Sequence, residues 1–367
     1  MDRLCVRLSY GARLPHVRRD LLDRARDHRL MFRTPRKGPA SQMLSLLAVA
    51  AALAAAVAAG GYAYSEAAAR RFEVSHPPAG RFVDVDGVRM HVIDWGPRDA
   101  AAAPVVLIHG ASSNALDMRA ALAESLATDR RVLIVDRPGH GYSARPDDGW
   151  RLQTQAQLIR GAVTRLGVER PVIVGQSFGG AVALAYVLNH PDEVGGLALL
   201  APVSHEWPGG VAWYNIASGV PVIGIVLRRL VLPIYGPMLA AGDFASAFSP
   251  DPPPADYAAR AGGLLLFRPD AFRSNAEDLR RLKAQIIDQQ SDYAQIRTPT
   301  TIAAGLADTT VSPAIHAEEL ARDIDGAELV RLDGAGHPLH HVRQREVVEI
   351  IRRTAARARR NADAVAE

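Results

Sequence analysis

Cysteine and lysine are almost missing from this chain. Cys5 is the only cysteine, so the chain can form no internal disulfide and has no CxxC motif of the kind that binds zinc. Lys37 and Lys283 are the only lysines, and arginine supplies nearly all of the positive charge. These absences exclude a disulfide-stapled fold and a cysteine-ligated metal centre, and they argue against a cysteine nucleophile.

The positive charge is concentrated at the N-terminus. Residues 1–37 contain eleven Lys or Arg and four Asp, a net charge of +7, whereas the whole chain of 367 residues carries +4. Residues 38–367 are therefore slightly acidic, with a net charge of −3. A nucleic-acid-binding domain needs a basic patch on its folded surface. The charge distribution indicates none, and we expect no nucleic-acid partner.

The uncharged stretch Met43–Tyr64 is long enough to cross a membrane. Its 22 residues, at about 1.5 Å each, match a hydrocarbon core of about 30 Å. Basic residues are denser before the stretch than after it, which predicts a signal anchor with the later domain on the non-cytoplasmic side. A signal peptide cleaved near Ala63, which would make the protein secreted or periplasmic, and a soluble alanine-rich helix are the alternative interpretations. The natural start could also be Met31 or Met43.

From residue 80 onward, short apolar runs alternate with helical patterns. Arg81–Val85 and Val88–Asp94, joined by Asp86-Gly87, predict a β-hairpin. Later runs such as Val105–Ile108 and Val172–Val174 are apolar throughout, which is typical of parallel strands covered by helices on both faces. The sequence therefore predicts an α/β fold with a mostly parallel sheet.

Composition divides the chain into six expected parts. Residues 202–297, rich in proline and in apolar helical segments, predict a helical cap inserted after the sixth strand. Two of its segments, Gly219–Tyr235 and Gly263–Phe267, are expected either to line the entrance of a site or to pack against the sheet. The other parts are a basic, disordered segment 1–42, the membrane helix 43–64, a linker 65–79, a core of residues 80–201 and 298–358, and a tail 359–367.

Gly175-Gln176-Ser177-Phe178-Gly179 follows an apolar run and opens a helical segment. A G-x-S-x-G between a strand and a helix predicts a sharp turn that exposes the hydroxyl of a nucleophilic serine, here Ser177. The N–H of Phe178 at the start of the helix, and that of Ala111 after His109-Gly110, are the expected donors to an oxyanion.

Asp308 and His337 each follow an apolar strand pattern within a glycine-containing loop. A serine becomes a good nucleophile when an imidazole takes its proton, and a carboxylate orients that imidazole. The order Ser–Asp–His is the one that accompanies a G-x-S-x-G turn. Glu206 is a rival acid, and His340 and His341 are rival bases.

Other polar motifs are expected to be structural. His109 should hold its loop in place, and the turn-rich Asp136–Ser143 should bond to the backbone through Asp136. Six further histidines have no metal-like spacing: His16, His28, His76, His190, His205 and His316. We expect neither a metal nor an organic cofactor.

Together these motifs resemble the alpha/beta-hydrolase superfamily over roughly residues 80–355. The resemblance implies an eight-stranded-type sheet and hydrolysis through a serine acyl-enzyme, without metal or cofactor. Ser177 stands where haloalkane dehalogenases and epoxide hydrolases carry aspartate, which excludes both mechanisms. The HGGG-type loop of hormone-sensitive-lipase-like esterases is absent.

The expected activity is hydrolysis of a carboxylic ester with an apolar acyl group by a membrane-anchored serine hydrolase. Lactonase, carbon–carbon bond hydrolase, perhydrolase and acyltransferase chemistries use the same motifs and stay open. A non-catalytic, hydrolase-like binding protein is the alternative from another class. The sequence leaves the substrate and the oligomeric state undetermined.

Overall fold

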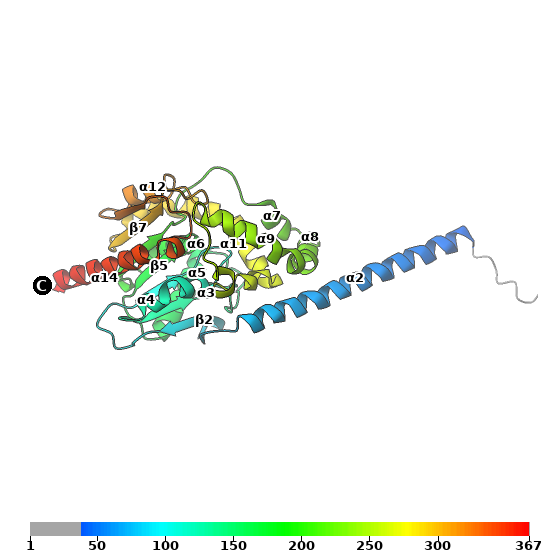
Figure 1. Cartoon of the computed structure of the whole chain (residues 1–367), viewed down its shortest axis with the longest axis horizontal. Helices are drawn as coiled ribbons and strands as arrows, with labels where there is room; N and C mark the ends of the chain where they lie inside the picture. Colours follow the sequence, from blue (N-terminus) through cyan, green and yellow to red (C-terminus); the bar gives the residue numbers. More distant parts are fainter. Residues whose placement is uncertain (1–37, 367) are drawn as a thin grey trace, which may run out of the picture. The chain divides into compact units, whose positions relative to one another are not determined.

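The computed structural model describes residues 38–366. The chain divides between Val57 and Ala58 into two units. The expected disordered segment 1–42 therefore lies almost wholly outside the described residues. One helix, α2 (Pro39–Ser75), runs through the boundary between the units and is the first helix that Figure 1 labels.

Helix α2 is longer than the sequence pattern predicted. It contains the expected apolar stretch Met43–Tyr64 and continues through Ser75, so most of the expected linker 65–79 is helical. Residues 66–74 include alanine, glutamate and arginine, which favour helix, and the first proline comes at Pro77. Among the described residues, α2 is the one helix with the length and composition to cross a membrane.

The catalytic unit is built on one sheet of eight strands in the order β1-β2-β4-β3-β5-β6-β7-β8 (Figure 1). Strand β2 runs antiparallel to both β1 and β4, and the pairs from β4 through to β8 are parallel. The expected mostly parallel α/β sheet is confirmed. The strands are β1 (Arg81–Val85), β2 (Val88–Trp95), β3 (Val105–Ile108), β4 (Val132–Val135), β5 (Val172–Gln176), β6 (Gly196–Leu200), β7 (Thr300–Gly305) and β8 (Glu328–Leu332).

The hairpin between β1 and β2 turns at the two residues that the sequence indicated. Asp86 and Gly87 both have positive φ, at 54° and 83°. Two positive φ values in succession belong to the tight turn whose twist matches that of paired strands.

Helices cover both faces of the sheet. The segment after β3 is helical through α3 (Ala115–Met118), η1 (Arg119–Ala123) and α4 (Glu124–Leu126). Helix α14 (Gln344–Ala366) extends beyond the predicted end at residue 358, so the expected tail 359–367 is helical through Ala366. The other covering helices are α5 (Leu152–Arg165), α6 (Phe178–Asn189), η2 (Pro191–Glu193), α12 (Ala317–Asp323) and α13 (Leu339–Val342).

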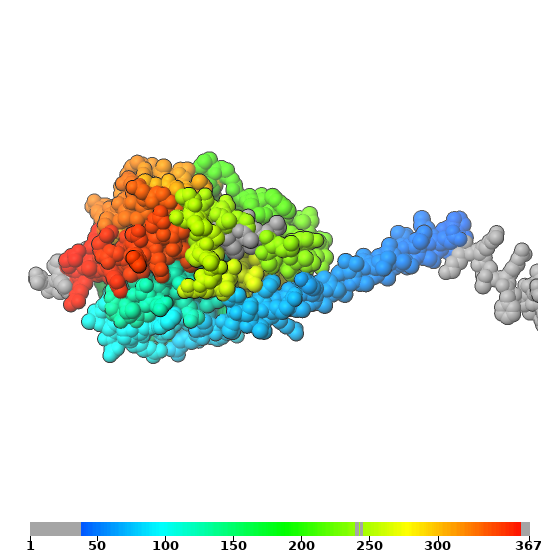
Figure 2. Space-filling view, viewed as in Figure 1, coloured from blue at the N-terminus to red at the C-terminus, as the bar shows by residue number. Residues whose placement is uncertain are grey.

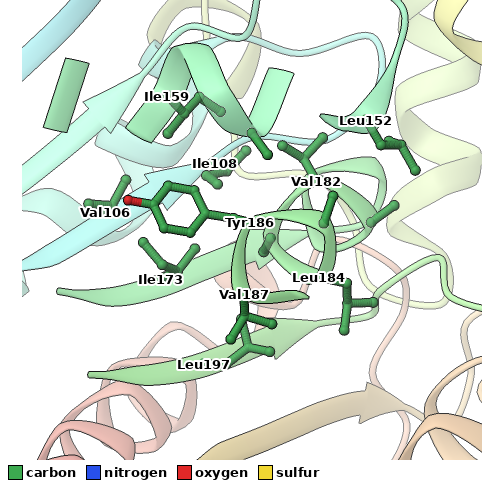
Figure 3. Packing of buried hydrophobic residues seen from close by; sticks show 14 of the residues in the cluster. Val106, Ile108, Leu152, Ile159, Ile173, Val182, Leu184, Tyr186, Val187 and Leu197 are labelled. Atoms are coloured by element: carbon green, nitrogen blue, oxygen red, sulfur yellow. The ribbon is translucent and has the colours of Figure 1, made fainter. Parts of the chain in front are cut away.

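The core lies in two apolar clusters, one on each face of the sheet. Val106 and Ile108 of β3 belong to one cluster, whereas Val105 and Leu107 belong to the other. This alternation follows from the pleat, because successive side chains of a strand point to opposite faces. Figure 3 shows the first cluster, where Tyr186 of α6 packs among the strand side chains.

Residues 202–297 lie between β6 and β7 and are described without any strand. They fold into helical segments, in agreement with the pattern expected of an inserted cap. These segments are α7 (Trp213–Ser218), α8 (Ile223–Val226), η3 (Leu227–Val231), α9 (Leu232–Phe248), α10 (Tyr257–Arg260), η4 (Gly263–Phe267), α11 (Pro269–Gln289) and η5 (Gln290–Gln295).

Candidate active site

Ser177 occupies a strained turn between β5 and α6. Its φ is 54° and its ψ is −118°, a conformation that residues other than glycine rarely adopt. A side chain at Gly175 would strike the carbonyl of Gly179, and one at Gly179 would strike the carbonyl of Ile108. The two glycines are therefore required by the close approach of the backbone, and the expected elbow geometry is confirmed.

Asp308 and His337 lie at the same edge of the sheet as Ser177, in the loops that follow β7 and β8. The Nδ1 of His337 lies 2.7 Å from Oδ2 of Asp308. The other carboxylate oxygen, Oδ1, accepts the backbone N–H groups of Thr310 and Val311 at 2.8 and 2.9 Å. With one oxygen held by the backbone, the other is fixed in position to orient the imidazole.

The second ring nitrogen of His337 faces the elbow. Its Nε2 lies 3.3 Å from the side-chain nitrogen of Gln176, the residue before Ser177. When Nδ1 donates its proton to Asp308, Nε2 keeps a lone pair and can accept a proton. Ser177 and His337 are each only 8% exposed. Gln176 is a site neighbour that the sequence analysis did not single out, since its position in G-x-S-x-G carries no pattern of its own.

The rival residues lie elsewhere. Glu206 is exposed, and its backbone N–H donates to Gln290. His340 and His341 face a different carboxylate, that of Asp117, at 3.0 and 2.8 Å. The structure therefore groups Asp308 with His337 and not with any of these alternatives.

The loop after β3 lies against the elbow. Ala111 lines the cavity described below, and Phe178 is the first residue of α6. Ser112 has a positive φ of 55° and is held by Asn275 of the cap, which accepts its N–H at 2.6 Å and donates to its hydroxyl at 3.1 Å. Asn275 thus ties the cap to the loop expected to supply an oxyanion donor.

His109 has the structural role that was expected. Its Nδ1 lies 2.8 Å from the carbonyl of Gly110, and its Nε2 accepts the backbone N–H of Arg137 at 3.0 Å. Burial, assisted by the charge of Arg137, holds the pKa of His109 well below its usual value. The imidazole is therefore neutral and fixes the loop after β3 against the loop after β4.

The loop Asp136–Ser143 is also structural, as expected. Asp136 accepts backbone N–H groups from Ala115 at 2.7 Å and Tyr142 at 2.9 Å. The cap reaches this loop through Asp278 of α11, whose Oδ2 lies 2.8 Å from Nη1 of Arg137.

Asp278 is fully buried, and its charge is balanced inside the protein. Burial alone would raise its pKa, but the hydrogen bond from His140 and the charges of Arg137 and Arg145 lower it to about 2. Removing one partner of such a buried pair typically costs about 3–5 kcal/mol. Sequence reasoning missed Asp278, because an aspartate on an amphipathic helix gives no motif.

A second polar cluster surrounds Asp117. Burial would raise the pKa of this carboxyl, but His340 and His341 hold it well below its usual range. Ser113 donates to the same carboxylate at 2.9 Å. In the described part of the chain, Asp117, His340 and His341 form a group with ligand atoms within 4.8 Å of one another. These atoms are close enough to hold a cation, although the sequence gave no reason to expect a metal.

An apolar cavity of about 540 Å³ ends beside Ser177. Ala111, Gln176 and His337 line one part of it. Most of the remaining wall comes from the cap, including Tyr214, Leu227, Val231, Leu232, Leu266, Phe267 and Phe272. The expected lining role of the two apolar cap segments therefore holds for Leu227 and Leu266, whereas Ile225 is 55% exposed and lies outside the wall.

A depression of about 690 Å³ is larger but has a charged wall that includes Arg145, Arg268 and Glu277. Its wall includes neither Ser177 nor His337. The apolar cavity is therefore the one that belongs with the candidate site.

Curated proteins similar to this chain carry hydrolase names. It is 33% identical to a 2-hydroxymuconate semialdehyde hydrolase of Pseudomonas sp. (strain CF600) over 136 residues, 36% of this chain and 46% of that protein. It is 27% identical to a 2-hydroxy-6-oxononadienedioate/2-hydroxy-6-oxononatrienedioate hydrolase of Klebsiella pneumoniae over 270 residues, 70% of this chain and 88% of the relative. The chain spans about half the length of the first of these relatives.

Solved structures share the fold. A putative lipase from Acinetobacter baumannii AYE superposes with a TM-score of 0.62 at 20% identity, over 80% of this chain and 96% of the other. The sequence model described as the alpha/beta hydrolase family matches residues 105–350, which is more than half of the chain. The chain therefore belongs to the alpha/beta hydrolase family, and the relatives named here are hydrolases.

Proposed function

We propose that this protein is a serine hydrolase that cleaves carboxylic esters with an apolar acyl part. The observation that carries the proposal is the apolar cavity, which ends at Ala111, Gln176 and His337 beside Ser177. A small ligand that fills such a cavity has its reactive end next to the hydroxyl at the elbow.

In the proposed first half-reaction, Ser177 Oγ attacks the ester carbonyl carbon while Nε2 of His337 takes the hydroxyl proton. The N–H groups of Ala111 and Phe178 stabilise the negative charge on the carbonyl oxygen. The carbon–oxygen bond of the ester then breaks, and the alcohol leaves with the proton that His337 returns. The acyl group stays on Ser177 as an ester.

In the second half-reaction, water attacks the acyl-enzyme and gives its proton to His337. The bond to Ser177 Oγ breaks, the serine regains its proton, and a carboxylic acid leaves. Asp308 orients the imidazole and stabilises its positive charge in both halves, without itself taking the proton. The balance requires water and ester alone.

Carbon–carbon bond hydrolysis is the second candidate, because some relatives are named as hydrolases of dioates. A dioate carries two carboxylates, and proteins usually bind carboxylates with arginine or lysine. The residues described as lining the cavity include neither arginine nor lysine, and they do include Asp117. This lining favours an uncharged acyl group.

We propose further that Met43–Tyr64 anchors the protein in a membrane. This part of α2 has no charge, and the side chains of Leu44, Leu46, Leu53 and Val57 are all more than half exposed. A helix of this length with apolar, exposed side chains fits a hydrocarbon environment. The excess of basic residues before it favours a catalytic unit on the non-cytoplasmic side.

Two measurements test the proposed activity. A fluorophosphonate probe should label the wild-type chain covalently and leave Ser177→Ala unlabelled. A panel of p-nitrophenyl esters of increasing acyl length should then show rising kcat/KM until the cavity is filled. Absence of both labelling and ester hydrolysis in the folded protein would refute the proposed function.

A further inference from the structure

The cap carries an apolar surface that the folding of the catalytic unit leaves uncovered. We call it the cap apolar face. Its side chains range from 38% exposed to 72% exposed, with Trp213 and Met238 the most exposed. Monomeric soluble proteins rarely gather so many large apolar side chains on one surface. The face consists of Trp213, Ile216, Val220, Val222, Ile223, Ile225, Val226, Val231, Ile234, Tyr235 and Met238.

These residues come from consecutive elements, α7, α8, η3 and the start of α9. Figure 1 shows α7, α8 and α9 gathered at one end of the catalytic unit, away from α14. Figure 2 shows part of this stretch, in green, at the surface. The face is thus one contiguous region of the cap and not a set of scattered residues.

The charge of this stretch is positive only. The sequence has no Asp or Glu between Glu206 and Asp243, but it has Arg228 and Arg229. An apolar surface with arginines and without acidic residues suits the lipid–water interface, where side chains enter the acyl region and cations meet phosphate.

The same stretch contacts the end of the proposed membrane anchor. Within the unit that begins at Ala58, Arg229 donates to Glu66 at 2.6 Å, and its guanidinium lies 4.5 Å from the ring centroid of Tyr62. Leu230 packs so closely on Gly61 that no side chain would fit there. Tyr62 lies in the last turn of the apolar stretch Met43–Tyr64. The cap therefore sits beside the helix at the level where that stretch leaves the lipid.

The cavity wall and the cap apolar face share residues. Trp213, Val231 and Tyr235 are 72%, 38% and 54% exposed, and all three also line the cavity. Leu232 and Phe272, which are buried, continue the wall inward. A ligand that enters between these three residues passes from the cap apolar face toward His337 without crossing a charged surface.

We propose that the cap apolar face inserts into the surface of the bilayer and that the cavity takes its substrate, a long-chain acyl ester dissolved in the lipid, directly from the membrane. This inference rests on the proposed anchored hydrolase and specifies its substrate class. A second copy of the chain is the other occupant that such a face could have. The bilayer is favoured because the end of the apolar helix contacts η3 beside the face.

Fluorescence quenching tests the insertion without any use of activity. The full chain contains four tryptophans, and it would be reconstituted in phosphatidylcholine vesicles with or without dibrominated acyl chains. Brominated lipid should quench part of the emission, and Trp213→Phe should remove most of the quenchable part. Equal quenching of both proteins, or none of either, overturns the proposal. Protection of Trp213 from both brominated lipid and aqueous acrylamide assigns the face to a second copy and also overturns it.

Kinetics test the route of the substrate. In vesicles, the double variant Val222→Asp/Ile225→Asp should lower kcat/KM for a lipid-dissolved long-chain ester by about tenfold or more, because charged side chains oppose insertion. Hydrolysis of a water-soluble short ester should stay unchanged. Val74→Asp changes an equally apolar residue that is 81% exposed on α2 outside the cap apolar face, and it should leave both rates unchanged.

A loss that is equal for the two esters in a folded double variant, or that Val74→Asp reproduces, overturns the proposed route. If the double variant does not fold, the Trp213 measurement decides. Retention of ester hydrolysis by Ser177→Ala would refute the proposed mechanism instead, and it would leave the quenching result standing.

Discussion

The Nδ1 atom of His337 lies 2.7 Å from Oδ2 of Asp308, although 29 positions separate the two residues in the chain. Strands β7 and β8 are parallel neighbours, so the loops that follow them meet at the same edge of the sheet. The backbone of Thr310 and Val311 holds the other oxygen of Asp308. This relationship makes the first prediction specific for each of the three proposed catalytic residues.

Ser177→Ala and His337→Ala should each lower kcat for ester hydrolysis by several orders of magnitude, by up to about 10⁶-fold. The double variant should lose little more than either single variant, since nucleophile and base act as one unit. Circular dichroism should show that each variant remains folded. Measurable wild-type turnover in Ser177→Ala would rule out the proposed acyl-enzyme.

Asp308→Asn should lower kcat by up to about 10⁴-fold, because the amide favours the wrong imidazole tautomer. Glu206→Gln is the matched control, since Glu206 is exposed and makes its hydrogen bond through the backbone. Its activity should stay close to wild type. A larger loss in the Glu206 variant than in the Asp308 variant would reverse the assignment of the acid.

Leu227→Asp should flatten the preference for long acyl chains among water-soluble esters. Leu227 lines the cavity, and each methylene buried there contributes at most about 0.8 kcal/mol, so a four-carbon extension of the acyl chain could raise kcat/KM by a hundredfold or more. Hydrolysis of an acetate ester should be nearly unaffected. Ile225→Asp is the control, because Ile225 lies two positions away but outside the cavity wall. Equal effects of the two substitutions would show that Leu227 does not contact the acyl chain.

The membrane anchor predicts where the chain can be truncated. The full protein should stay in the membrane fraction through high-salt and alkaline washing, because the apolar stretch is held by hydrophobic contact and not by charge. A chain that begins at Ala58 should lose this tight association and keep ester hydrolysis, since it retains the contacts of Glu66 and Glu73 with the cap.

A chain that begins at His76 loses both ion pairs and the packing of Gly61 on Leu230, and its thermal unfolding temperature should be lower than that of the chain from Ala58. An N-terminus of the mature protein near residue 64, measured by mass spectrometry, would instead identify a cleaved signal peptide. Equal unfolding temperatures of the two truncated chains would show that residues 58–75 do not support the cap.

Protonation of His316 should make the fold sensitive to acid. Burial, followed by the charge of His205, lowers its pKa from 6.5 to about 4. Its Nδ1 also accepts the backbone N–H groups of Ser204 and His205, both at 3.2 Å. A proton on Nδ1 would remove both hydrogen bonds.

The unfolded chain binds this proton below pH of about 6.5, and the folded chain only below about 4. The contribution to stability is therefore complete above pH of about 6.5 and is lost as the pH falls toward 4, with a slope of up to about 1.4 kcal/mol per pH unit. Urea unfolding at several pH values measures this slope. His316→Gln should be less stable at pH 7.5 and show a shallower slope between pH 6.5 and 4. An unchanged slope would exclude His316 as the acid-sensitive group.

The sequence by itself determined the strand order along the chain, the sharp turn at Ser177 and the loops that carry Asp308 and His337. These features depend on signals within a few residues: continuous apolar runs, a glycine on each side of a close backbone approach, and two-residue turns. The ends of α2 and α14 were less well determined, because helix-favouring residues continue beyond the apolar pattern and give no stop signal.

Only the tertiary structure decided which distant polar residues meet. Asn275 reaches Ser112 across 163 positions, and Asp278 reaches Arg137 across 141 positions. Both lie on α11, where they are two polar residues among many on an amphipathic helix. Their partners depend on how α11 crosses the sheet domain, which is set by the packing of the whole cap and not by any local pattern. The same packing decided that Leu227 lines the cavity while Ile225, two residues earlier, faces outward.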